Sequence, residues 1–118
     1  MAYIDGFVVA VPSINKEQYK AYAKQCIDTF KQEYGALACK ECWGDDVPEG
    51  EITSFPLAVK AQDDETVVFS WITWPSKEVR DIGMQKCMQD PRFDPLKSPM
   101  PFDGKRMIYG GFEVLVDE

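Results

Sequence analysis

The chain has 118 residues, of which 13 are basic and 20 acidic, and its formal net charge is −7. This length fits one domain, residues 1–118, with a hydrophobic core of its own. So acidic a chain without a basic stripe is a poor partner for nucleic acid or for an anionic membrane, because both attract clustered Lys and Arg.

Residues 3–11, YIDGFVVAV, predict a first strand that ends at Pro12. Both alternate rows of this strand are largely apolar, so we expect both faces of its sheet to be covered. The segment contains Asp5 and no basic region precedes it. We therefore expect neither a signal peptide nor a membrane span, and a cytoplasmic location.

Residues 15–34 predict the clearest helix, because apolar side chains recur three and four positions apart. Asn15 is expected to cap its first turn, with Gln18 reaching back in a capping box. Gly35 stands where a left-handed residue closes a helix. The apolar stripe is interpreted as core; it consists of Tyr19, Tyr22, Ala23, Cys26, Ile27, Phe30 and Tyr34.

A second strand is predicted over residues 36–44, and it contains the motif Cys39-x-x-Cys42. Residues three apart in a strand point to opposite faces, and the chain has no histidine to complete a zinc site. A redox pair would need a helix N-terminus to lower its thiol pKa. We interpret all four cysteines as ordinary thiols, and we expect no metal and no cofactor.

The second half of the chain alternates strand and helix signals. A short extra strand is expected around residues 57–61, where Pro56 confines it to an edge or a strand start. Residues 66–74, TVVFSWITW, predict a strong strand, and Ser76 is expected to cap the helix that follows. Gly83 in that helix indicates a close approach to the sheet.

Residues 90–104 hold four prolines and are expected to lack regular structure. The last strand is predicted over residues 107–116. Its adjacent Gly110 and Gly111 indicate either a bulge or a close contact.

The resulting order, β-α-β-β-α-β, predicts an α+β fold: a ferredoxin-like sheet with two helices on one face. The other face would be bare, and we expect it to carry Tyr3, Phe7, Val9, Tyr109 and Leu115. A patch of that size is unusual on a soluble monomer, so a second copy is expected to cover it and form a homodimer.

Several long stretches carry a resemblance to a known family: YIDGFVVAVP, ECWGDDVPEGEITSFPLAVK, ETVVFSWITWPS, MQDP and MPFDGKRMIYGGFE. Over essentially its whole length the chain resembles an uncharacterised family of small bacterial proteins within the dimeric α+β barrel superfamily. The resemblance implies this fold and the dimer, but no reaction. Haem chemistry, which several relatives in that superfamily perform with histidine, is disfavoured here because histidine is absent.

Five residues are candidates for a site at the interface between the sheet and the dimer partner. Asp5 or Glu113 would be a base, Arg106 would hold an anionic group, and Tyr109 and Trp71 would form apolar walls. Arg106 and Lys105 are also the expected ion-pair partners of the two acids.

The main hypothesis for the function is that the protein holds a small, partly aromatic molecule in that pocket. A cofactor-independent monooxygenase-like or isomerase-like enzyme is the first alternative, and whether the protein is an enzyme stays open. A structural or stress-related dimer without a ligand is the second alternative.

Overall fold

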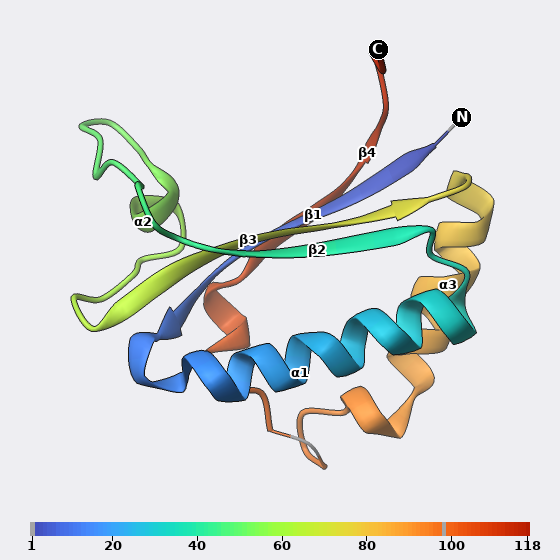
Figure 1. Cartoon of the computed structure of the whole chain (residues 1–118), viewed down its shortest axis with the longest axis horizontal. Coiled ribbons are helices and arrows are strands. Elements are labelled where there is room, and N and C mark those ends of the chain that lie inside the picture. Colours follow the sequence, from blue (N-terminus) through green and yellow to red (C-terminus); the bar gives the residue numbers. More distant parts are fainter. Residues whose placement is uncertain (1, 98) are drawn as a thin grey trace.

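The computed structural model describes residues 2–97 and 99–118, which form an α+β fold with one four-stranded antiparallel sheet (Figure 1). The α+β class predicted from the sequence is confirmed. The strands are β1 (Tyr3–Pro12), β2 (Ala38–Trp43), β3 (Glu65–Trp74) and β4 (Ile108–Glu113), and the α-helices are α1 (Lys16–Thr29), α2 (Phe55–Ala58) and α3 (Lys77–Gln89). In this described part of the chain, no helix has the length and apolar composition that crossing a membrane requires.

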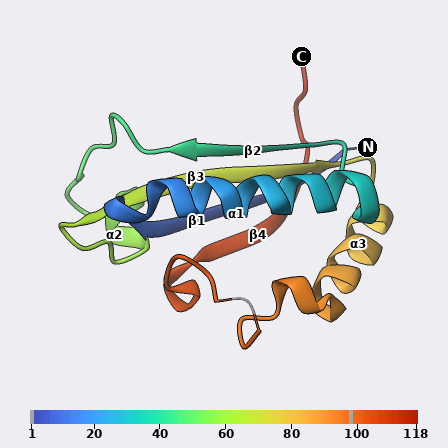
Figure 2. The same cartoon turned by 60° about the horizontal axis from the view of Figure 1, so that its bottom comes forward.

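The strands lie in the order β2-β3-β1-β4. The two long central strands pair along their whole length, from Tyr3 opposite Trp74 to Pro12 opposite Glu65. The shorter strands β2 and β4 form the two edges. Figure 2 shows α1 running lengthwise along the sheet, with α3 at one end of it.

The face of the sheet beneath the helices holds two core clusters. One joins Val9 and Val11 of β1 to Tyr19 of α1, and the other joins Phe30 to Trp74, with Tyr3 and Phe7 packed against it. The prediction that the row of Tyr3, Phe7 and Val9 faces away from the helices is therefore wrong. Both rows of β1 are apolar, so the alternation of the sequence could not decide which row the helices cover.

The opposite row makes a partly uncovered surface, which we call the open face: Ile4, Phe69, Trp71, Ile108 and Phe112. Phe112 and Phe69 keep 61% and 42% of their area exposed. A missing side chain at Gly6 and at Gly110 leaves room for the Phe112 ring, which lies within 3.7 Å of both positions. At one end of this face, Val59 covers a small third cluster with Val8, Ala10 and Val67.

The helix boundaries follow local signals with one exception. Gly35 has a φ of 94° and closes the wider turn Phe30–Tyr34 that extends α1, as predicted. Asn15 makes no side-chain cap, so the predicted capping box is wrong. Its amide instead donates to the Pro101 carbonyl oxygen at 3.2 Å, which fastens the proline-rich segment to the start of α1.

Helix α3 begins and packs as the sequence indicates. The Ser76 hydroxyl accepts a hydrogen bond from the Val79 amide at 3.2 Å. A side chain at Gly83 would come within 2.6 Å of the Trp74 ring and of the Tyr34 carbonyl oxygen. The close approach predicted for Gly83 is confirmed.

Two other predictions change. The extra strand at 57–61 is wrong, because α2 forms there instead: Ser54 caps it by accepting from the Leu57 amide at 3.1 Å, and a proline stands in its first turn. No bulge interrupts β4, which pairs continuously with β1. The second interpretation of the two glycines holds at Gly111, where an added Cβ would come within 2.5 Å of the Tyr3 hydroxyl and 2.7 Å of the Arg80 guanidinium.

A single 3-10 turn, Pro91–Phe93, lies within the proline-rich segment 90–104. A second one, Gly104–Arg106, begins at the last residue of the segment. Two of its aromatic side chains are partly buried and pack against the core: Phe93 against the cluster around Trp74, and Phe102 against the cluster around Tyr19. The described parts of the segment, residues 90–97 and 99–104, thus run below α1 in the view of Figure 2 and contribute to both core clusters.

Candidate functional site

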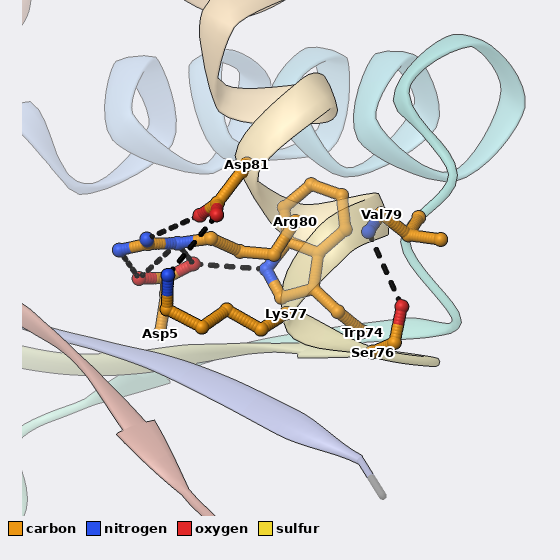
Figure 3. Close-up of polar contacts among 7 residues, drawn as sticks. All are labelled: Asp5, Trp74, Ser76, Lys77, Val79, Arg80 and Asp81. Carbon is orange, nitrogen blue, oxygen red and sulfur yellow. Dashed lines mark hydrogen bonds and ion pairs between the residues drawn. The ribbon is translucent and has the colours of Figure 1, made fainter.

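A buried polar cluster centres on Asp5, which keeps 3% of its surface area exposed (Figure 3). The Arg80 guanidinium donates from Nη2 to Oδ1 at 2.9 Å and from Nε to Oδ2 at 3.0 Å. The Trp74 indole nitrogen donates to Oδ2 at 2.9 Å. Arg80 also lies over the Tyr3 ring, 5.2 Å from its centroid.

This cluster has the character of a structural clamp. Both carboxylate oxygens of Asp5 are occupied by protein donors, so no oxygen is left to take a proton from a ligand. The carboxylate raises the pKa of the Arg80 guanidinium through their hydrogen bonds. The expectation that Arg106 or Lys105 is the partner of Asp5 is wrong, because α3, and not the turn before β4, lies over this part of β1.

Arg106 has a different role at the far end of the sheet. Its Nη1 and Nη2 donate to the two carboxylate oxygens of Glu65 at 2.7 and 2.6 Å, and its Nε donates to Asp103 at 3.1 Å. This forked contact lowers the pKa of the Glu65 carboxyl. Arg106 therefore joins the start of β4 to the start of β3 and has little capacity left for an anionic ligand.

The remaining candidates lie apart. Glu113 is exposed at the end of β4, and Tyr109 is 72% exposed beside the Phe7 ring, with centroids 6.5 Å apart. Trp71 belongs to the open face, opposite to the face that carries Asp5. Their assignment to one ligand site stays a prediction, and these positions do not favour it.

A cleft of about 570 Å³ opens between α1 and the edge strand β2. It forms because α1 presents one face, with residues three and four positions apart, to the sheet margin. From α1 it is lined by Lys16, Tyr19, Lys20, Ala23, Lys24 and Ile27, and from the sheet by Glu41, Cys42, Trp43 and Val68.

A tyrosine–carboxylate pair bridges the cleft. The Tyr19 hydroxyl donates to Oε1 of Glu41 at 2.5 Å. Glu41 as a residue is exposed on the edge strand, but its carboxyl group lies in the cleft, and the loss of hydration there raises its pKa. Burial, and then the nearby Glu41 charge, raise the pKa of the Tyr19 hydroxyl.

One wall of the cleft is both aromatic and basic, because it is formed by Trp43 and by lysines of α1. The Lys16 ammonium lies 5.4 Å from the centre of the Trp43 ring, within the range of a cation–π contact. Lys16, Lys20 and Lys24 are spaced four residues apart and so share one side of α1. A local basic row thus borders the cleft of a strongly acidic protein.

Sequence reasoning missed this site because Tyr19 was assigned to the core and Glu41 was not singled out. Tyr19 is indeed 7% exposed and packs with Val9 and Val68, so the assignment to the core is confirmed. The available signal was Glu41 itself. It lies on the helical face of β2, opposite buried Ser70, where a solvated carboxylate is not expected.

The cysteines do not form a metal site in the described residues, where no group of three or more potential Cys, Asp or Glu ligands gathers. Cys39 pairs opposite Ile72 and Cys42 opposite Phe69, so the two point to opposite faces as predicted. Burial raises the pKa of the Cys26 thiol to about 12 and of the Cys39 thiol to about 11. These are unreactive thiols at neutral pH.

Comparison with known proteins places the chain in a family. Residues 2–104 match the model of "Protein of unknown function (DUF1428)". The chain is 58% identical over 118 residues, all of both chains, to the "Uncharacterized protein YbaA" of Escherichia coli K12, and equally to those of Escherichia coli O157:H7 and Shigella flexneri. The chain therefore belongs to the bacterial DUF1428 family.

Proposed function

We propose that the protein is a small homodimeric binding protein that holds a partly aromatic molecule in the cleft between α1 and β2. The observation that carries this proposal is the cleft itself: a mostly apolar space with a flat aromatic wall and a few converging polar groups. Such a composition is typical of small-molecule sites. The ligand site thus differs from the pocket at the dimer interface expected from the sequence.

We also propose the ferredoxin-like fold and a dimeric α+β barrel. Support comes from the strand order β2-β3-β1-β4, in which β1 and β3 are central and all pairs are antiparallel, since this is the order of a split βαβ repeat. A second copy over the open face would cover its aromatic side chains. Phe69 there contacts Phe55 and Trp71, with ring centroids 5.8 and 5.5 Å apart.

A cytoplasmic location completes the proposal. The four cysteines are free thiols, which suits a reducing compartment.

The test uses 2-naphthol, a neutral two-ring probe, and isothermal titration calorimetry with Trp43→Ala and Trp71→Ala. Trp43 lines the cleft, whereas Trp71 belongs to the open face. Binding that is lost in Trp43→Ala and kept in Trp71→Ala supports the cleft. Loss in Trp71→Ala alone would move the site to the dimer interface, and no binding of either 2-naphthol or 6-hydroxy-2-naphthoate to the wild type would contradict the proposal.

Catalysis is a second candidate because Glu41 is a carboxylate with a raised pKa in an apolar cleft, a combination that suits a general base. Glu41 would accept a proton from the acidic methylene of an anthrone-like substrate, and O2 would oxidise the resulting anion to the quinone, one oxygen atom becoming the new carbonyl and the other leaving as water with the two released protons. In an isomerisation Glu41 would instead return the proton to another carbon of the same molecule. Incubation with anthrone under oxygen, without added cofactor, tests this. A rate above background that disappears in Glu41→Gln supports an enzyme, and a background rate in the wild type contradicts this activity.

A further inference from the structure

We propose that the cleft selects planar aromatic acids that also carry a hydroxyl or amino group. The inference rests on the binding function proposed above and adds the chemistry of the ligand. Three features of the cleft carry it: two lysines without acidic partners, one available carboxylate oxygen, and an apolar middle.

The lysines supply the site for an acidic group. Lys24 is neutralised by Asp28 in the next turn of α1, with Nζ and Oδ1 2.7 Å apart. Lys16 and Lys20 make no ion pair with any carboxylate in residues 2–97 and 99–118. Two lysines that lie one helical turn apart and line the cleft, in a protein of net charge −7, form a localised attraction for an anion.

Glu41 supplies the site for a hydrogen-bond donor. Its Oε1 accepts from Tyr19, while Oε2 has no hydrogen-bond partner among the described residues. Glu41 is an exposed residue that lines the cleft, so we place Oε2 within reach of a ligand there. A ligand hydroxyl or amino group can donate to it, and a ligand that covers this oxygen without donating removes its water and offers no hydrogen bond in exchange.

The middle of the cleft favours a flat ring system. Ala23, Ile27 and Val68 provide apolar surface within the same cleft, and the Trp43 ring forms a wall. Aromatic groups gain from stacking on such a wall in addition to burying apolar area.

The two polar sites together set the selectivity. An aromatic acid without a donor would satisfy the lysines but leave the Glu41 carboxylate desolvated. A phenol without an acid would satisfy Glu41 but leave the lysines unused. A molecule that carries both groups satisfies both sites.

Three probes on one scaffold test the inference by calorimetry at pH 7: 6-hydroxy-2-naphthoate, 2-naphthoate and 2-naphthol. We expect 6-hydroxy-2-naphthoate to bind at least about tenfold more tightly than either of the others, since each lost charged hydrogen bond costs roughly this factor. Equal binding of all three would overturn the inference but leave the proposed function intact. Absence of all binding would overturn both.

Variants assign the selectivity to its residues. Glu41→Ala is expected to remove the advantage of 6-hydroxy-2-naphthoate over 2-naphthoate, with partial recovery in Glu41→Gln. The double variant Lys16→Gln/Lys20→Gln is expected to remove its advantage over 2-naphthol. The double variant Lys31→Gln/Lys86→Gln changes two exposed lysines outside the cleft, with the same change of charge, and is the matched control that should keep wild-type selectivity. Selectivity retained in the double variant and in Glu41→Ala would overturn the assignment, and thermal melts confirm that each variant is folded.

Discussion

Arg80 of α3 reaches over the sheet to Asp5 of the central strand β1, with Nη2 2.9 Å from Oδ1 and Nε 3.0 Å from Oδ2. This forked contact joins an element from the second half of the chain to the first strand. Gly111 of β4 has no side chain, and its Cβ position lies 2.7 Å from the same guanidinium. The guanidinium of Arg80 thus lies where three elements meet: α3, β1 and β4.

Removing Arg80 is therefore expected to be costly. Arg80→Met keeps the apolar stem but leaves a carboxylate that is 3% exposed with only the Trp74 indole as partner. We expect the free energy of unfolding to fall by about 3 kcal/mol, measured by urea denaturation at fixed protein concentration. Lys77→Met, which breaks an exposed pair with Asp81, is the control and should change it by less than about 0.5 kcal/mol. Equal effects of the two variants would contradict the clamp.

Gly83 offers a second test of packing. A methyl group there would meet the Trp74 ring and the Tyr34 carbonyl oxygen at 2.6 Å, and neither can move easily because Trp74 is fully buried. Gly83→Ala raises helix propensity, yet we expect a net loss of about 1–3 kcal/mol from overpacking. Gln85→Ala, on the exposed side of the same helix, should be neutral or slightly stabilising. A stabilised Gly83→Ala protein would show that α3 does not approach the sheet this closely.

Glu41 makes a prediction about pH. Its pKa in the folded protein is raised above the ordinary value of 4.5, so the folded state holds this proton more tightly than the unfolded state does. The contribution of Glu41 to stability is therefore most favourable below pH 4.5 and declines as pH rises through the raised pKa. The stability of Glu41→Gln relative to wild type should accordingly increase between pH 4 and pH 7. A difference that stays constant or decreases across this range would contradict a raised pKa of the Glu41 carboxyl in the folded protein.

The open face makes a prediction about assembly. Phe112→Lys places a charge where the proposed partner sheet would lie, so we expect sedimentation velocity at micromolar concentration to show a dimer for the wild type and a monomer for this variant. Ile14→Lys changes a side chain that is 91% exposed outside the open face and should remain dimeric. A monomeric wild type would contradict the proposed barrel.

The positions of the helices and strands could be predicted from the sequence more accurately than the sheet face that each residue occupies or the side chain that it contacts. The long periodic segments at α1, β1 and β3 were correct because a strong pattern and clear end signals agreed, such as Gly35 and Ser76. The strand predicted for residues 57–61 is wrong because a proline suits the first turn of a helix as well as the start of a strand.

The candidate site was less predictable for a physical reason. Arg80 and Arg106 are equally plausible partners for Asp5 until the placement of α3 is known, because ion pairs between distant segments have no sequence period. The pKa of Glu41 is raised only because α1 lies over its carboxyl group and removes water from it. The cleft therefore follows from tertiary packing and from no local motif.

The most direct test of the central claim is to record which of the three tryptophan indole N–H signals shifts in a ¹H–¹⁵N NMR titration with 6-hydroxy-2-naphthoate. Trp43 lines the cleft, Trp71 belongs to the open face and Trp74 is buried against Asp5. The account predicts a large, saturable shift of the Trp43 signal, with Trp71 and Trp74 nearly unchanged. A saturable shift of Trp71 with Trp43 unmoved would contradict it.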